Sequence, residues 1–186
     1  MEFATPVKLP DGRRFLKITG QTLQLNGVKV QEGLAGPNVT VIVPESLASK
    51  ISALDEEIVT KAKADKLVWF GADLADSTIQ GAFQESLTDG TLGASLAKIK
   101  GEIVTRAFDS QKNPVELSSV GEGAQCDLLV ELAGLWFLKK SFGTVWRIVQ
   151  ARVRSPPKAP AFPSQYMFED EVEEPQAEDD PTDYID

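Results

Sequence analysis

The stretch from Cys126 to Arg154 constrains the fold of this chain more than any other segment does. It reads CDLLVELAGLWFLKKSFGTVWRIVQARVR, in which two apolar runs with high β propensity flank a short break at residues 141–143. This pattern predicts a β-hairpin, because the glycine of the break is available for a left-handed turn position. A three-residue loop places Lys140 opposite Thr144. A two-residue loop would realign every cross-strand pair, so both registers stay open.

Side chains alternate along the predicted strands and sort the hairpin into two faces. With the three-residue loop, the face that carries Trp136 and Trp146 is expected to join the core. The opposite face, which carries Phe137, Lys139 and Arg147, is expected to meet a ligand.

Aromatic rings and fixed positive charges are interleaved along this hairpin, and no acid occurs between Glu131 and Glu169. A groove for single-stranded nucleic acid needs this combination, because rings stack on unpaired bases and cations neutralise phosphates. The strand expected at 13–19 repeats the pattern on one side. The candidate nucleic-acid-binding residues are Phe137, Lys139, Lys140, Phe142, Arg147, Arg152, Arg13, Phe15 and Lys17. The alternative is a structural hairpin whose solvated Lys and Arg residues guard its edges against aggregation.

The rest of the chain predicts a mainly β fold with one internal helical segment. Asn26-Gly27 indicates a tight hairpin turn, and Gly101 is expected to bend a long strand. Residues 45–66 carry apolar side chains at helical spacing, whereas 73–91 is ambiguous, with a short helix around 79–87 as one alternative. Roughly six to eight strands favour an elaborated OB-fold, a Greek-key β-barrel, over another β-sandwich. The expected strands cover residues 13–19, 22–25, 28–31, 39–43, 67–71 and 95–108.

The net charge of −9 is distributed unevenly along the chain. Ten of the 28 acids lie in residues 164–186, which contain no base, so residues 1–163 hold 18 acids against all 19 bases. Such asymmetry suggests a nucleic-acid-binding body with an acidic interaction tail. We therefore divide the chain into a binding domain at 1–154, a Pro-rich linker at 155–163 and an acidic tail at 164–186, which has too few apolar residues to fold alone.

The tail ends in acids mixed with one aromatic and one aliphatic residue. One interpretation is a solubilising tail. The other is a peptide that docks into basic-rimmed hydrophobic pockets of partner proteins and, when unbound, competes with nucleic acid for the protein's own groove. The residues assigned to this partner-binding tip are Asp179, Asp180, Asp183, Tyr184, Ile185 and Asp186.

Histidine is absent from the sequence, and Cys126 is the single cysteine. These two facts exclude Ser-His-Asp and Cys-His catalysis, histidine-containing zinc sites and iron–sulfur clusters. We expect neither a metal nor a cofactor. No apolar run approaches the ~20 residues that span a bilayer, and the N-terminal residues lack a secretory-signal pattern. We therefore expect an intracellular protein with no membrane partner.

The block from Gly134 to Val153, GLWFLKKSFGTVWRIVQARV, resembles the closing hairpin of OB-fold replication single-stranded DNA-binding proteins from phages and large DNA viruses. In that family an aromatic-rich strand, a Lys/Phe-Gly turn and a Trp-containing strand follow one another. They correspond here to Leu135–Lys139, Lys140–Gly143 and Val145–Val149. The Pro-rich linker and acidic tail add to the resemblance. Asp186 departs from it, because family members usually end in an aromatic residue.

The resemblance implies a non-enzymatic protein that binds single-stranded DNA without sequence specificity in replication, recombination or repair, in the host cytoplasm or nucleus. It also implies that the tail recruits replication proteins such as DNA polymerase or a helicase/primase, and it leaves a homodimer open. Two other classes remain as alternatives. One is a structural or assembly adaptor that uses the tail for docking. The other is a Mg²⁺-dependent nuclease built from Asp73, Asp76, Glu85 and Asp89, which lack a recognisable metal-binding spacing.

Overall fold

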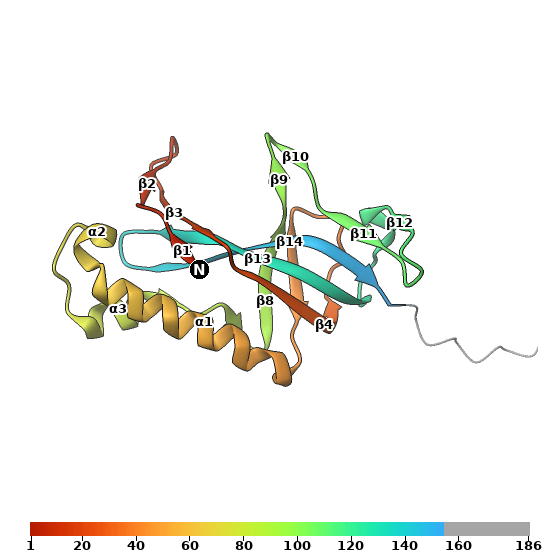
Figure 1. Ribbon diagram of the computed structural model, residues 1–186, viewed down its shortest axis with the longest axis horizontal. Helices are drawn as coiled ribbons and strands as arrows, with labels where there is room; N and C mark the ends of the chain where they lie inside the picture. The colour runs from red at the N-terminus through yellow and green to blue at the C-terminus, as the bar shows by residue number, and fades with distance from the viewer. Residues whose placement is uncertain (155–186) are drawn as a thin grey trace, which may run out of the picture.

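The computed structural model describes residues 1–154, which form a mainly β fold with helices inserted between two of its strands (Figure 1). The predicted linker at 155–163 and tail at 164–186 lie outside the described residues. The helices are α1 (Glu45–Ala64), α2 (Lys66–Phe70), α3 (Asp76–Ala82) and the short 3-10 helix η1 (Leu117–Ser119). The strands are β1 (Glu2–Phe3), β2 (Val7–Lys8), β3 (Arg14–Thr19), β4 (Thr22–Val30), β5 (Asn38–Ile42), β6 (Phe83–Gln84), β7 (Leu87–Thr88), β8 (Thr91–Leu96), β9 (Lys98–Ile99), β10 (Glu102–Ile103), β11 (Arg106–Phe108), β12 (Pro114–Val115), β13 (Gln125–Phe137) and β14 (Phe142–Val153).

Five strands close into a ring, because β4 pairs with β5, β5 with β8, β8 with β14, β14 with β13, and β13 again with β4. All of these pairings are antiparallel except that of β8 with β14, the third and fifth strands of the ring in chain order. A closed five-stranded ring in which consecutive strands are not all neighbours is a Greek-key barrel, with the strand count of OB-type barrels. The predicted fold class is confirmed.

The β13–β14 hairpin is the longest element of the barrel and runs across most of the molecule in Figure 1. Along its free edge, β13 pairs first with β4 and then, nearer the turn, with β3. Gly20, with φ of 78°, separates β3 from β4. Register shifts at Leu129/Val130 and Leu132/Gly134 interrupt the β13–β14 ladder. Such bulges increase local twist and let a long hairpin wrap around a small barrel.

The register of this hairpin differs from the prediction. Phe137 pairs with Phe142 and Trp136 with Gly143, so the turn consists of residues 138–141 and Gly143 lies within the strand. The Leu138 N–H donates to the Ser141 carbonyl oxygen at 2.8 Å and closes this turn. Next to the turn, the predicted and observed partners of a β13 residue differ by an odd number of positions. Such a slip exchanges the two faces of β13 relative to β14.

The helices α1 and α2 follow each other almost directly, and α1 lies along one side of the strands in Figure 1. The predicted helix at 45–66 is confirmed. Its buried side chains Ile51, Leu54 and Ile58 recur at helical spacing and join the barrel core.

Residues 67–71 were expected as a strand but mostly form α2. The apolar sequence LVWF fits a short buried strand or a short helix equally well, since periodicity cannot separate them over four residues. Gly71 decides the outcome: its left-handed φ of 73° ends the helix, and its N–H bonds the Leu67 carbonyl oxygen. The helix places Trp69 in the core beside Phe3.

The single long strand expected at 95–108 is also wrong. The chain leaves β8, forms the β9–β10 hairpin and returns as β11. Lys100 and Gly101 have φ of 51° and 87°, which reverses the chain where a bend was predicted. Figure 1 shows the β9–β10 hairpin projecting from the barrel. No helix within residues 1–154 is both long and apolar enough to cross a membrane.

Candidate nucleic-acid interface

Phe137 and Phe142, predicted to contact a ligand, lie in the core with exposed fractions of 6% and 1%. Their rings stack with centroids 5.7 Å apart, and Phe70 of α2 meets both of them edge-on. The four-residue turn brings residues 137 and 142 together at its base, facing the helices. A base could reach neither ring without opening the core, so their assignment to the binding surface is wrong.

Trp136, predicted to be in the core, lies instead on the outer face of the hairpin and is half-buried. Phe15 of β3 is its direct cross-strand neighbour on the same face, and it is also half-buried. Each ring lies over a glycine. A Cβ built on Gly134 would overlap the Phe15 ring, and one built on Gly143 would come within 2.7 Å of Trp136 Cζ2. The glycines therefore let two rings settle on the sheet while part of each stays accessible.

Cations lie on the same face as these two rings and in the nearby hairpin turn. Lys17 follows Phe15 on the same face of β3 and is exposed. Arg147, half-buried, extends from the outer face of β14, where it lies opposite Glu131 and next to Ser95 of β8. Two further cations, Lys139 and Lys140, are exposed in the hairpin turn. We call Phe15, Lys17, Trp136, Lys139, Lys140 and Arg147 the aromatic–basic surface.

Small side chains continue this surface from β14 across β8 to β5. Ser95 pairs with Arg147, and Gly93 pairs with Thr40. A Cβ built on Gly93 would meet nothing within 4 Å, so the backbone there is open to solvent. An open strip beside stacking rings leaves space for an extended ligand strand to follow the sheet.

Arg13, another predicted site residue, is paired within its own loop. Its guanidinium contacts Asp11 at 2.6 Å, and the pair holds the turn before β3. The neighbouring Arg14, which the sequence analysis did not select, lies over the buried Phe137 ring with its Cζ 5.9 Å from the centroid. A cation over a ring face is attracted by the ring's quadrupole, so Arg14 helps to seal this end of the core.

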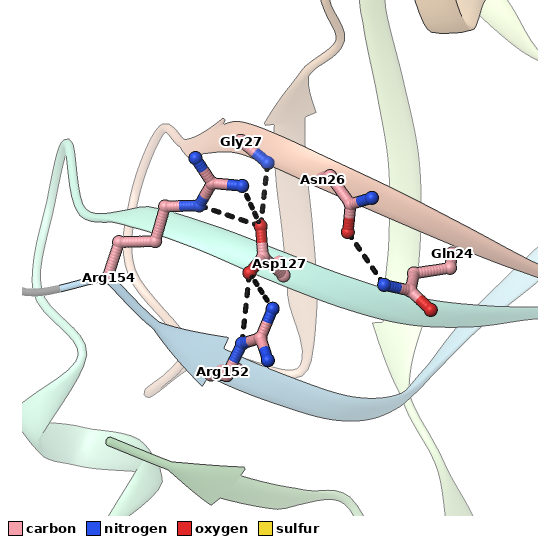
Figure 2. Close-up of polar contacts among 6 residues, drawn as sticks. All are labelled: Gln24, Asn26, Gly27, Asp127, Arg152 and Arg154. Carbon is pink, nitrogen blue, oxygen red and sulfur yellow. Dashed lines mark hydrogen bonds and ion pairs between the residues drawn. The ribbon is translucent and has the colours of Figure 1, made fainter. Parts of the chain in front are cut away.

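Arg152 lies at the opposite end of the hairpin from the aromatic–basic surface, in a cluster around Asp127 (Figure 2). The Asp127 carboxylate, 7% exposed, accepts hydrogen bonds from Arg152, Arg154 and the Gly27 N–H. Burial alone would raise the pKa of Asp127, but the bonds from Arg154, Arg152 and Gly27 outweigh it and lower that pKa. Asp127 thus ties Gly27 in the middle of β4 to the start of β13 and the end of β14.

A second buried carboxylate, Asp55 of α1, lies at the inner side of the hairpin. It accepts bonds from the Ser86 hydroxyl at 2.6 Å and from the Ser86 N–H at 2.8 Å. The same hydroxyl contacts Thr144 and accepts from the Trp146 indole N–H at 3.0 Å. Burial raises the pKa of Asp55, although the bonds from Ser86 oppose the shift. This network fixes α1 to β14 and leaves its polar atoms satisfied, as a structural site does.

Residues 1–154 contain one cysteine and no side-chain cluster that could hold a metal ion. Cys126 is buried, and burial raises the pKa of its thiol to about 11, so the thiolate is scarce at neutral pH. Over the same residues no group of three or more His, Cys, Asp or Glu side chains is placed to hold a metal ion.

Comparisons with known proteins show which structures and which family this chain resembles. The structure is similar to a single-stranded DNA-binding protein from bacteriophage Enc34, with a TM-score of 0.50 and 11% identity over 90% of this chain and 97% of that one. A C-terminal truncation of the same phage protein matches with a TM-score of 0.50 and 10% identity, over 84% of this chain and 97% of that one. No curated protein matches the sequence. A family model described as a family of unknown function (DUF5871) matches residues 26–170, and the chain belongs to this family.

Proposed function

We propose that this protein is a non-enzymatic, non-sequence-specific single-stranded DNA-binding protein that acts in replication, recombination or repair. The observation that carries the proposal is the aromatic–basic surface, in which Phe15 and Trp136 lie side by side on the outside of a Greek-key barrel. The aromatic side chains offer ring area for stacking. Lys17 lies beside them and Arg147 lies further along β14, where both can meet phosphates.

The expected energetics follow from these groups. Stacking of a base on an aromatic ring contributes about 1–3 kcal/mol, and every base has a π-face, so the interaction tolerates any sequence. Phosphate contacts add a term that weakens as salt rises, because binding releases counterions. The phage protein with the similar fold is named for binding single-stranded DNA, and an OB-type barrel is a common scaffold for that ligand.

The negative charge of residues 164–186 gives the tail a part in this proposal. We propose that residues 164–186 recruit replication proteins such as DNA polymerase or a helicase/primase, and compete with DNA for Lys17, Lys139 and Lys140 when no partner is bound. The assigned tip, Asp179 to Asp186, lies outside the described residues. An intracellular replication site and a homodimer belong to the same proposal.

Deleting residues 164–186 tests the competition. Affinity for oligo-dT at about 50 mM salt is expected to rise several-fold, and the gain should shrink at about 200 mM, where screening weakens both ligands. Fluorescence anisotropy of a labelled oligonucleotide measures it. An affinity that stays the same or falls would show that the tail is not an internal competitor.

Binding itself is tested with labelled dT oligonucleotide, its duplex counterpart and Mg²⁺. The proposal predicts salt-reversible binding to the single strand, much weaker binding to the duplex, and an intact oligonucleotide after incubation with Mg²⁺. Shortened oligonucleotide would favour a nuclease. Absence of binding at low salt would favour the adaptor class.

A further inference from the structure

A pocket with both apolar and charged lining residues lies on the outer face of the hairpin, at the opposite end from the turn. It has a volume of about 310 Å³ and lies between β11 and the β13–β14 ladder. Phe108 of β11 is half-exposed in its wall, and Leu129 and Ala151 contribute apolar surface. The remaining lining residues are Gln24, Lys112, Asp127, Leu128, Gln150 and Arg152.

The charges of this pocket favour an anion although Asp127 lines it. The Asp127 carboxylate is occupied by Arg152 and Arg154, whose guanidinium nitrogens lie 2.5 and 2.6 Å from its two oxygens (Figure 2). With Lys112, which also lines the pocket, three cations stand against two anions, because Asp109 lies in the same turn as Lys112. The nearby Asp109 carboxylate is engaged by Gln111 and Asn113 of its own turn. An incoming phosphate would therefore meet net positive charge and guanidinium groups already held in place.

We infer that this pocket is a second nucleotide subsite, which takes one base against Phe108 and the adjoining phosphate beside Lys112 and Arg152. The volume lies at the lower end of the range for ligand pockets, which suits a group of the size of one nucleobase. An aromatic wall with amides and fixed cations around it matches the three parts of a nucleotide that proteins recognise on unpaired strands. The inference rests on the proposed function, and it assigns that function a second point of contact.

The register of the hairpin gives the distance between the two contact points. Trp136 and Gly143 are cross-strand partners, as are Asp127 and Arg152, and nine positions separate the two pairs on each strand. At about 3.3 Å per residue this is about 30 Å. A strand with a stacked rise of about 3.4 Å per nucleotide needs about nine nucleotides to cover it, and fewer if it is extended.

Oligonucleotide length therefore tests the subsite. The full-length protein and its Phe108→Leu variant are titrated with a labelled dT pentamer, about 17 Å long at that rise, and a dT 15-mer of about 51 Å. Leucine keeps apolar packing but removes the ring. The variant is expected to bind the 15-mer about tenfold more weakly and the pentamer as tightly as the unmodified protein does.

A variant that removes one positive charge tests the phosphate contact of the subsite independently. Lys112→Gln is expected to reduce the slope of log affinity against log salt for the 15-mer by about one, and to leave the slope for the pentamer unchanged. Lys50→Gln, on the exposed side of α1, is the matched control and should change neither slope. Thermal unfolding of each variant checks that the fold is intact.

The outcomes separate the subsite from the proposed function. If both Phe108→Leu and Lys112→Gln bind the 15-mer as the unmodified protein does, the subsite is disproved while single-strand binding stands. If the unmodified protein binds neither oligonucleotide, the proposed function fails and the subsite fails with it. A site for free mononucleotide would appear as binding of dTMP that Phe108→Leu weakens, with unchanged affinity for the 15-mer, and that result also overturns the subsite.

Discussion

Both faces of the β13–β14 hairpin carry aromatic residues, but those on the inner face pack in the core and the one on the outer face is partly accessible. Phe137, Phe142 and Trp146 point inward and form core, whereas Trp136 points outward beside Phe15. The adjacent residues Trp136 and Phe137 thus face opposite sides of the sheet, where Trp136 is half-buried and Phe137 is buried. The difference teaches that an aromatic-rich sequence does not identify a stacking surface; register decides which rings a base can reach.

The largest expected effect comes from replacing these adjacent aromatics one at a time. Phe137→Ala should reduce the free energy of unfolding by about 3–5 kcal/mol, because it leaves a cavity among the stacked aromatic rings of the core. Trp136→Ala should cost much less stability but weaken binding to oligo-dT about tenfold. Urea unfolding and anisotropy titrations measure the two quantities. If Phe137→Ala left stability intact and abolished binding, the assignment of the two faces would be reversed.

The two buried carboxylates extend the comparison to pH. Asp127, on the outer face, has a lowered pKa, so it contributes stability above the ordinary carboxyl pKa of about 3.9, and this contribution is lost as pH falls toward the folded-state pKa. Asp127→Asn should cost about 1–3 kcal/mol at neutral pH, because the bonds to two guanidiniums weaken. Its cost should shrink below about pH 4.

Asp55, beside the inner face, should behave in the opposite way. Its raised pKa means that the folded protein holds the proton more tightly, so its ionised form disfavours folding at neutral pH and the penalty falls as pH drops through the raised value. Asp55→Asn serves as the contrasting variant in the same unfolding series. A cost for Asp127→Asn that does not change between neutral and acidic pH would contradict the Asp127 account.

A smaller effect is expected from the glycine beneath Trp136. Gly143→Ala places a Cβ 2.7 Å from Trp136 Cζ2 and should displace the indole, lowering oligo-dT affinity a few-fold and shifting the tryptophan emission. Gly121→Ala is the matched control, because its Cβ would meet nothing within 4 Å and it lies outside the aromatic–basic surface. Equal affinities for the two variants would show that the position of Trp136 does not matter for binding.

Much of the fold could be predicted from the sequence, because periodicity reports local structure directly. The β13–β14 hairpin and the α1 helix each carry a strong local signal. The hairpin turn predicted at Asn26-Gly27 is wrong, because β4 runs as one strand from Thr22 to Val30 and only its register against β13 shifts at this dipeptide. The Leu67–Phe70 segment carries no such signal, since four apolar residues suit either structure. Its helical state depends on Gly71 and on packing of Trp69 against distant residues.

The candidate site could be predicted only in part. The residue types indicated stacking and phosphate contact. Which side chains point outward, however, depends on the length of the hairpin loop. The prediction treats Gly143 as a turn residue, whereas it lies within β14 under Trp136. Gly143, which lies directly opposite Trp136 on the neighbouring strand, was the available signal that Trp136 belongs to the outer face. The pocket beside Phe108 and Lys112 had no signal in the sequence, because the parallel β11–β14 pairing brings together residues far apart in the chain.

Tryptophan fluorescence tests the central claim most directly, since the chain has three tryptophans and Trp69 and Trp146 are buried. The account predicts that oligo-dT quenches the emission of the unmodified protein, that salt reverses the quenching, and that Trp136→Phe removes most of it while anisotropy still detects binding. Quenching that persists undiminished in Trp136→Phe, or binding that leaves the emission of the unmodified protein unchanged, would contradict the claim that bases stack on the outer face of this hairpin.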